Sequence, residues 1–246
     1  MAETNRVSRS IPQATVDTND ASNRGGRYGE QYSAPLHSPR HYLADEGSYF
    51  IATNPTPGTA IAVTTSITTF AETAGAVAGA MLFKNTESRT AASPKRIYLD
   101  YIKLVVLGVP TSATAWQYAL VIDDNPVRYT SGGSALTPVN PNGDSSETSI
   151  ATVYFGALTT AVTNNKRLVA RGNLRGVIPT TFDTLVIVSG GVEGGGSAVS
   201  AAASGRFVDN CPPIIVGPQQ NLLLSLWGPS CAAAATFELE AGWWER

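Results

Sequence analysis

The sequence predicts an all-β protein: a single β-sandwich of jelly-roll-like type, preceded by an extended N-terminal arm. About ten short runs rich in β-branched and aromatic residues follow one another, separated by Gly, Pro and Asn turns. No run has the apolar spacing of an amphipathic helix, and no period marks a propeller or a solenoid. Large apolar residues are sparse before residue 46. We therefore expect a flexible arm over residues 1–45 and the β-sandwich domain over residues 46–246.

The predicted arm has few large apolar side chains, scattered singly among Ser, Thr, Asn, Gly and Pro. Such a segment cannot bury enough surface to offset the entropy of ordering, so alone it is expected to be disordered. Its charges balance, whereas a tail that binds nucleic acid is more one-sided. Two interpretations remain: a solvated tail, or an arm that becomes ordered on a neighbouring subunit. In the second, the predicted contact residues are its arginines and tyrosines: Arg6, Arg9, Arg24, Arg27, Tyr28, Tyr32, Arg40 and Tyr42.

The stretch from residue 96 to 123 predicts two long strands joined by a turn at 110–114. The first strand has apolar residues on both sides, so we expect it to be central and covered on both faces. The second has one bulky side, because alternate residues of a strand share a face. The core residues predicted from this pair are Tyr98, Leu104, Trp116 and Leu120.

The remaining strands are predicted to be short and separated by proline and glycine. The segment 124–149 is dense in turn-forming residues and predicts an exposed excursion, and the Gly- and Ala-rich segment 189–206 predicts a mobile loop. Residues 71–80 are compatible with a strand, a helix or a loop. Two short strands are expected on either side of a turn at 54–58, and two more on either side of 172–173. The other short strands are expected at 81–84, 150–158, 184–188, 214–216, 221–227 and 236–244.

Charged residues make up 15% of the chain, against about 25% in ordinary globular proteins. This composition predicts a neutral surface, which suits a protein whose outside is largely covered in an assembly, although an extracellular β domain would have a similar composition. A net charge of −2 gives no general attraction for nucleic acid, and no apolar run is long enough to span a membrane. No secretory signal is recognisable, which favours a reducing compartment. Cys211 and Cys231 are then expected as buried free thiols, with a single bridge as the alternative.

The sequence offers little that resembles a catalytic, metal or cofactor site, so we expect a protein that is not an enzyme. The two histidines, His37 and His41, have the spacing of metal ligands on a helix, but Pro39 lies between them. No glycine-rich loop is followed by the lysine of a phosphate-binding site. No catalytic, metal-binding or cofactor-binding residue is predicted.

Two carboxylate pairs could in principle serve a glycoside hydrolase. Asp123 and Asp124 are adjacent in sequence and are expected to point in opposite directions, as caps of a turn. Glu238 and Glu240 share one side of the last strand and are expected on a solvent-facing edge.

Aromatic residues leave a sugar-binding module open as an alternative. Trp243 and Trp244 are consecutive in a predicted strand, so one is expected to enter the core and the other to face outward.

Four segments carry a resemblance to a known class of proteins: EGSYFIATNPTPGTAIA (46–62), KRIYLDYIKLVV (95–106), RYTSGGSALTPVNPN (128–142) and RLVARGNLRGVIP (167–179). Together they resemble virion structural proteins of tailed bacteriophages. The resemblance implies a capsid decoration or cement protein that binds the major capsid protein and copies of itself, as a homotrimer, in a virion assembled in the host cytoplasm. A neck or baseplate component is the near alternative. A glycan- or receptor-binding module that uses residues 129–149 or 190–205 is another.

Overall fold

The computed structural model divides the chain into two units, Met1–Tyr42 and Leu43–Arg246. In the first unit, strand β1 (Arg24–Gly25) pairs antiparallel with β2 (Gln31–Tyr32). The division lies three residues before the predicted end of the arm. The structure describes residues 24–25, 31–32, 44–54, 56–62, 78–109, 116–161, 165–175, 180–190, 206–227 and 236–246.

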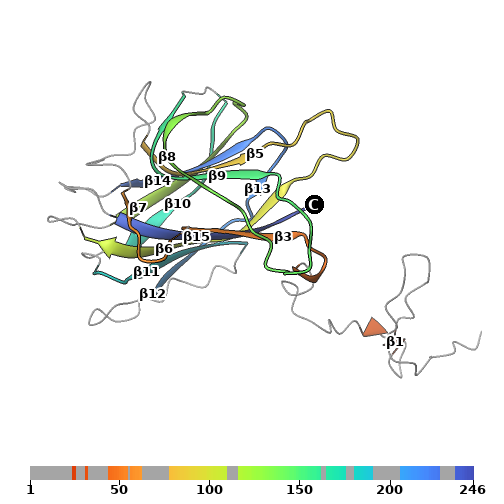
Figure 1. The fold of residues 1–246 in the computed structure, drawn as a ribbon, viewed down its shortest axis with the longest axis horizontal. Helices are drawn as coiled ribbons and strands as arrows, with labels where there is room; N and C mark the ends of the chain where they lie inside the picture. The colour runs from red at the N-terminus through yellow and green to blue at the C-terminus, as the bar shows by residue number, and fades with distance from the viewer. Residues whose placement is uncertain are drawn as a thin grey trace, which may run out of the picture. The chain divides into compact units, whose positions relative to one another are not determined.

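The second unit consists of two β-sheets packed face to face, so the predicted all-β sandwich is confirmed (Figure 1). One sheet has six strands, all paired antiparallel, in the order β10-β7-β14-β5-β9-β8. Its strands are β10 (Arg167–Arg175), β7 (Trp116–Asp123), β14 (Asn221–Trp227), β5 (Ala78–Asn85), β9 (Ala151–Thr160) and β8 (Tyr129–Leu136).

The other sheet has seven strands, with the order β12-β11-β6-β15-β3 and two short additions. Strand β13 pairs with β6, and β4 pairs with β15. Strands β11 and β12 run parallel, and the other pairs of this sheet are antiparallel. The strands are β12 (Arg206–Cys211), β11 (Thr184–Ser189), β6 (Ile97–Gly108), β15 (Thr236–Glu245), β3 (Tyr49–Thr53), β13 (Ile215–Val216) and β4 (Ile61–Ala62).

The two long strands predicted between residues 96 and 123 are β6 and β7, but they do not pair with each other. Strand β6 lies between β11 and β15, whereas β7 lies between β10 and β14 in the opposite sheet. The chain crosses from one sheet to the other between them. The prediction that the first strand is central holds, but its outer face is not covered, since Tyr101, Lys103 and Val105 are only half-buried.

A β-bulge in β6 changes which residues of the strand face the core. Leu99 pairs with Trp243 and Tyr101 pairs with Gly242, so Asp100 is the extra residue. Before the bulge Leu99 faces the core, and after it Leu104 does. Because the bulge shifts the alternation, residues 98 and 104 do not share a face.

The four predicted core residues therefore differ in their outcome. Leu104 and Leu120 are buried in the main hydrophobic cluster. The prediction for Tyr98 is wrong, because its side chain is half-buried on the outer face and stacks on Trp244. The side chain of Trp116 lies outside the described residues.

The main core lies between the sheets and is centred on aromatic rings. Trp243 of β15 is fully buried, with its ring edge-on to Phe83 of β5 at 4.7 Å between centroids and stacked near Phe50 of β3 at 6.3 Å. These contacts join the two sheets. A second, smaller cluster of Leu82, Leu158 and Leu223 involves the other face of the six-stranded sheet.

One predicted loop contains a strand. The excursion predicted over 124–149 includes the edge strand β8. The loop predicted over 189–206 connects β11 to β12, and its residues 191–205 lie outside the described residues. The two short pieces predicted around 172–173 are one strand, β10, with two register shifts. Strand β5 includes residues 78–80, which the sequence left undecided.

Candidate functional site

A groove lies on the outer face of the seven-stranded sheet, where the chain leaves β3. Asn54 holds the segment that follows β3 through two hydrogen bonds. Its side-chain oxygen accepts a hydrogen bond from the Leu239 amide at 3.0 Å, and its side-chain nitrogen donates to the Thr59 carbonyl at 2.8 Å. The cavity has a volume of 260 Å³, small against the roughly 300–1,000 Å³ of typical ligand pockets. It is lined by Thr53, Asn54, Pro57, Lys103, Val105, Glu238, Leu239 and Glu240.

The charged groups of the groove are already bonded within the protein. Lys103 Nζ lies 2.9 Å from a Glu240 carboxylate oxygen, and the Tyr101 hydroxyl donates to the other at 2.7 Å. Burial raises the pKa of Glu240, but the hydrogen bonds from Tyr101 and Lys103 and the charge of Lys103 outweigh it, so the pKa lies below its usual value. Glu238 accepts a hydrogen bond from the Gly58 amide. An ionised, neutralised carboxylate is a poor general acid, so the pair does not resemble a hydrolase dyad.

The prediction of a solvent-facing edge for these glutamates is half right. Both side chains face outward and are partly exposed. Strand β15, however, pairs with β6 on one side and with β3 and β4 on the other, so it is not an edge strand.

An aromatic row crosses the same outer face. Trp244 is in register with Tyr49 of β3 and with Tyr98 of β6, and the Trp244 and Tyr98 rings are parallel, with centroids 6.0 Å apart. The expected opposite orientation of the two tryptophans is confirmed, because Trp243 is buried and Trp244 faces outward. One face of each stacked ring is covered by the other. The row therefore leaves less open ring face than a sugar platform requires.

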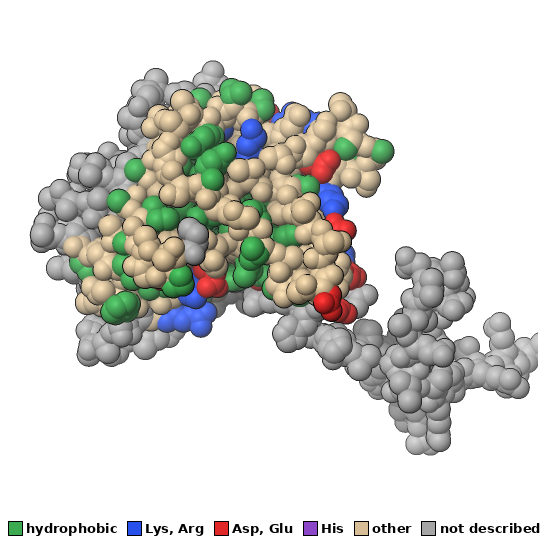
Figure 2. Space-filling view, in the orientation of Figure 1, with side chains coloured by type: hydrophobic (Ala, Val, Ile, Leu, Met, Phe, Trp, Pro, Cys, Tyr) green, Lys and Arg blue, Asp and Glu red, His purple; other side chains and the backbone are tan. Residues whose placement is uncertain are grey.

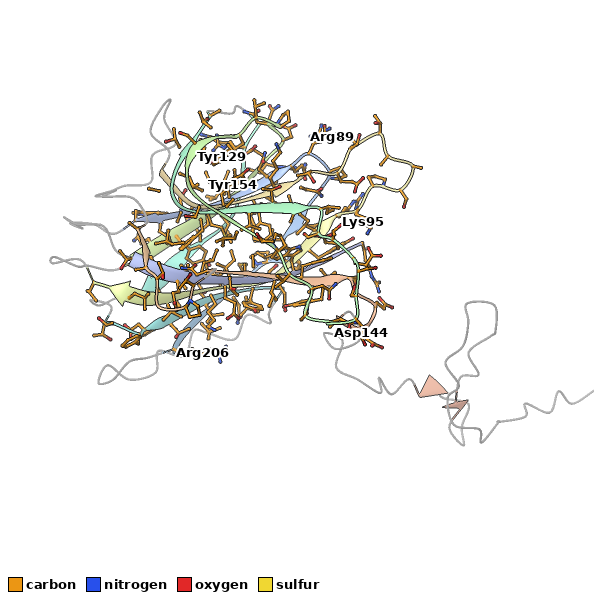
Figure 3. The ribbon with its side chains drawn as sticks, viewed as in Figure 1. Arg89, Lys95, Tyr129, Asp144, Tyr154 and Arg206 are labelled. Atoms are coloured by element: carbon orange, nitrogen blue, oxygen red, sulfur yellow. The ribbon has the colours of Figure 1, made fainter. Side chains whose placement is uncertain are left out.

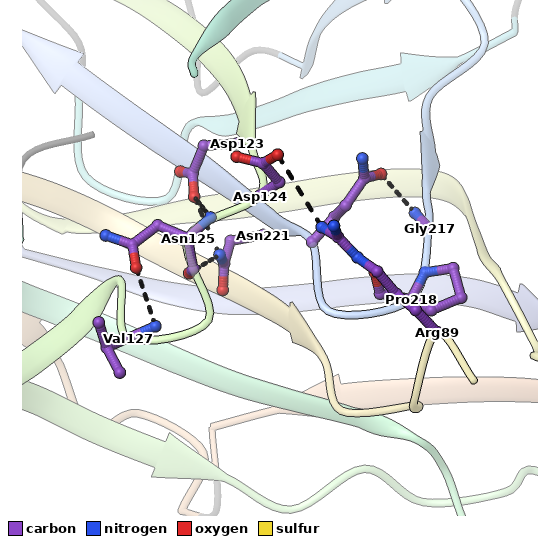
Figure 4. A network of polar contacts seen from close by, with 9 residues as sticks. Arg89, Asp123, Asp124, Asn125, Val127, Gly217, Pro218 and Asn221 are labelled. Carbon is purple, nitrogen blue, oxygen red and sulfur yellow. Dashed lines mark hydrogen bonds and ion pairs between the residues drawn. The ribbon is translucent and has the colours of Figure 1, made fainter. Parts of the chain in front are cut away.

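A buried polar network holds the turn that follows β7 (Figure 4). The Asp123 carboxylate accepts hydrogen bonds from the Asn125 amide at 3.1 Å and from the Asn221 side chain at 3.0 Å. Its other oxygen lies 3.1 Å from Nε of Arg128, and both charged side chains are fully buried. The Arg128 guanidinium also donates to the Ala161 carbonyl. The turn-cap role predicted for Asp123 is present, and the ion pair around it is structural.

The neighbouring carboxylate, Asp124, points to the surface, as predicted for adjacent residues. It lies 4.0 Å from Arg89, and both side chains are well exposed. This ion pair is also drawn in Figure 4. An exposed pair at this distance contributes little to stability.

Two tyrosines stack on the outside of the six-stranded sheet, against the second hydrophobic cluster (Figure 3). The rings of Tyr129 and Tyr154 lie 3.8 Å apart between centroids, and the Tyr129 hydroxyl donates to the Gly132 carbonyl at 3.0 Å. Both rings are half-buried. This pair is a cross-strand contact between β8 and β9.

Cys211 is a buried free thiol in an acidic environment. Burial, and then the charge of Asp209, raise its pKa to about 11, so the thiol is protonated and unreactive at neutral pH. Asp209 also accepts a hydrogen bond from Tyr118 at 3.0 Å, and burial followed by Asp209 raises the pKa of that tyrosine far above its usual value. Cys231 lies outside the described residues.

The contact residues predicted in the arm belong to the first unit, Met1–Tyr42. The side chains of Arg24 and Tyr32 are not described, and the other six, Arg6, Arg9, Arg27, Tyr28, Arg40 and Tyr42, lie outside the described residues. His37 and His41 also lie outside them. Within the described ranges, no three His, Cys, Asp or Glu side chains gather where they could hold a metal ion. No helix in this part of the chain is long and apolar enough to span a membrane.

Sequence reasoning missed Arg128 and the groove. The signal for Arg128 was a lone charged residue between Val127 and Tyr129, within the predicted excursion. The groove depends on the pairing of β3 with β15, which are distant in sequence and carry no local signal. Comparison with protein-family models and with curated proteins gives no match.

Proposed function

We propose that this chain is a non-enzymatic structural protein of a virus particle, a capsid decoration or cement protein. It binds across capsid subunits through its β domain and its N-terminal arm, and thereby stabilises the shell. Its partners are the major capsid protein and other copies of the chain, as a trimer.

The observation that carries the proposal is the order of the strands. Eight strands make up the central part of the two sheets: β3, β5, β6, β7, β10, β11, β14 and β15. Numbered one to eight in chain order, they lie in the order 1-8-3-6 in one sheet and 2-7-4-5 in the other. Every neighbouring pair among them is antiparallel. This order supports a jelly roll, which is found in viral capsid proteins, lectins and cupins. Strands β8 and β9 extend one sheet, and β12 extends the other.

The other jelly-roll functions fit the residues less well. A cupin holds its metal largely through histidines of the barrel, and the sequence from residue 43 onward contains none. A lectin site needs open aromatic faces beside polar groups, whereas the outward-facing rings of Tyr98 and Trp244, and of Tyr129 and Tyr154, stack on one another. The low share of charged residues suits a subunit packed among others, and Figure 2 shows a face dominated by neutral and hydrophobic side chains, with charged ones at its margins.

Deletion of residues 1–42 tests the role of the arm. The truncated chain is expected to keep its far-UV circular dichroism and cooperative melting, because the two-sheet core lies within Leu43–Arg246. It is expected to lose most of its binding to purified particles stripped of the protein, since ordering of the arm on a neighbour contributes part of the contact. Binding equal to that of the full chain would remove the arm from the mechanism.

A further inference from the structure

Phe182 combines an exposed side chain with a strained backbone. Its φ is +69°, in the left-handed region that bulky residues rarely adopt, and its side chain is 65% exposed. In the described part of the chain the only other non-glycine residue with positive φ is Gln219, which is polar. A glycine or asparagine at position 182 would relieve the strain and remove an apolar ring from water. Strain of this kind persists where the surrounding structure imposes it, and it often marks a function.

The turn around Phe182 is held rigidly. The buried Asp183 carboxylate accepts hydrogen bonds from the Thr180 amide at 2.6 Å and from the Thr180 hydroxyl at 2.9 Å. The Phe182 amide donates to the Val106 carbonyl at 2.6 Å, and the Val106 amide donates to the Asp183 carbonyl at 2.9 Å. The ring is therefore presented on a fixed support, which lowers the entropic cost of using it as an anchor.

A receptor for such a ring exists on the same sheet. Val105, the neighbour of Val106, lines the groove between β6, β15 and the end of β3. Pro57, Val105 and Leu239 form the apolar part of the groove. Its Lys103 and Glu240 are already paired with each other, and its Glu238 accepts a hydrogen bond from the Gly58 amide. An uncharged guest therefore leaves no buried charge without a partner. Because Phe182 is largely exposed, it does not occupy the groove of its own chain.

We propose that Phe182 of one copy of this chain inserts into the groove of a second copy. This rests on the proposed function, in which copies lie side by side on a shell, and it names the contact between them. An aromatic anchor in a pocket is the usual centre of such an interface. The low share of charged residues in the chain, 15%, further favours self-association.

Sedimentation velocity of the full chain over a wide concentration range tests this contact. The wild type is expected to reach a multiple of 25.8 kDa. Phe182→Asn removes the ring and suits the left-handed backbone, and Thr53→Trp fills the groove from an exposed position. Each is expected to weaken association by about tenfold or more. Leu168→Asn is the matched control, because it removes another apolar side chain that is more than half exposed, on β10, and it is expected to associate like the wild type.

Thermal melting gives a second readout that a merely structural Phe182 would not produce. At concentrations low enough for the wild type to be monomeric, Phe182→Asn is expected to raise the melting temperature by about 2–4 °C, because backbone strain is relieved. Association of Phe182→Asn equal to wild type, or a wild type that stays monomeric at every concentration, would overturn the proposal. Unimpaired association of Thr53→Trp would overturn the groove as the receptor. Cosedimentation with phosphatidylcholine vesicles that Phe182→Asn abolishes would assign the ring to a membrane instead. None of these outcomes depends on whether the chain is found in particles, which tests the proposed function separately.

Discussion

Replacing Arg128 by Met is expected to lower the free energy of unfolding by about 3–5 kcal/mol, because it leaves the Asp123 carboxylate buried without its countercharge. The Ala161 carbonyl also loses a donor. The remaining hydrogen bonds to Asp123, from Asn125 and Asn221, compensate only partly. Urea denaturation of the variant and the wild type measures the loss.

Two further variants distinguish the effect of breaking the buried ion pair from the effect of removing any arginine. Arg89→Met makes the same substitution in the exposed pair with Asp124 and is expected to cost less than about 1 kcal/mol. Asp123→Asn combined with Arg128→Met removes both charges and is expected to recover part of the loss, since no unpaired charge stays buried. Equal losses for Arg128→Met and Arg89→Met would contradict the buried-pair account.

Replacing Trp243 by Ala is expected to cost about 3–5 kcal/mol, through lost burial and the cavity that remains. The indole is fully buried and bridges the sheets through Phe50 and Phe83. Its ring nitrogen donates to the buried Glu245 carboxylate at 2.9 Å, so the substitution also removes a donor from a buried acceptor. Differential scanning calorimetry and denaturant unfolding both report the loss.

The neighbouring residue provides the matched control. Trp244 faces outward and makes a cross-strand contact with Tyr98, so Trp244→Ala is expected to cost less than about 2 kcal/mol. If the two alanine variants were equally unstable, Trp243 would not be the centre of the core.

Composition and turn residues sufficed to predict an all-β fold, because strand propensity and proline or glycine breaks are local properties. Strands such as β14 and β15 were predicted within a few residues. The pairing of strands was less accessible. Strands β6 and β7 resemble a hairpin in sequence, yet they lie in opposite sheets. The short segment between them, 110–114, has residues that are compatible both with a tight turn and with a connection between sheets.

The candidate site was largely beyond sequence reasoning. The bulge at Asp100 reverses the facing of Tyr98 relative to Leu104, and no local signal marks it. The strain at Phe182 is a property of the assembled turn, because it depends on bonds to Val106 of another strand. Arg128 is buried because Asp123 is buried beside it, although an isolated arginine is expected at the surface.

The central claim is that this chain is a building element of a virus shell, and its copy number per particle tests that claim most directly. Under this proposal the chain is a component of purified virus particles, and quantitative mass spectrometry of those particles gives its copy number against the major shell protein. We predict a stoichiometry on the scale of the shell subunits, in the hundreds of copies for a symmetric head. About a dozen copies or fewer would assign the chain to a neck or tail and contradict the shell role, and absence from the particle would contradict a structural role in the virion altogether.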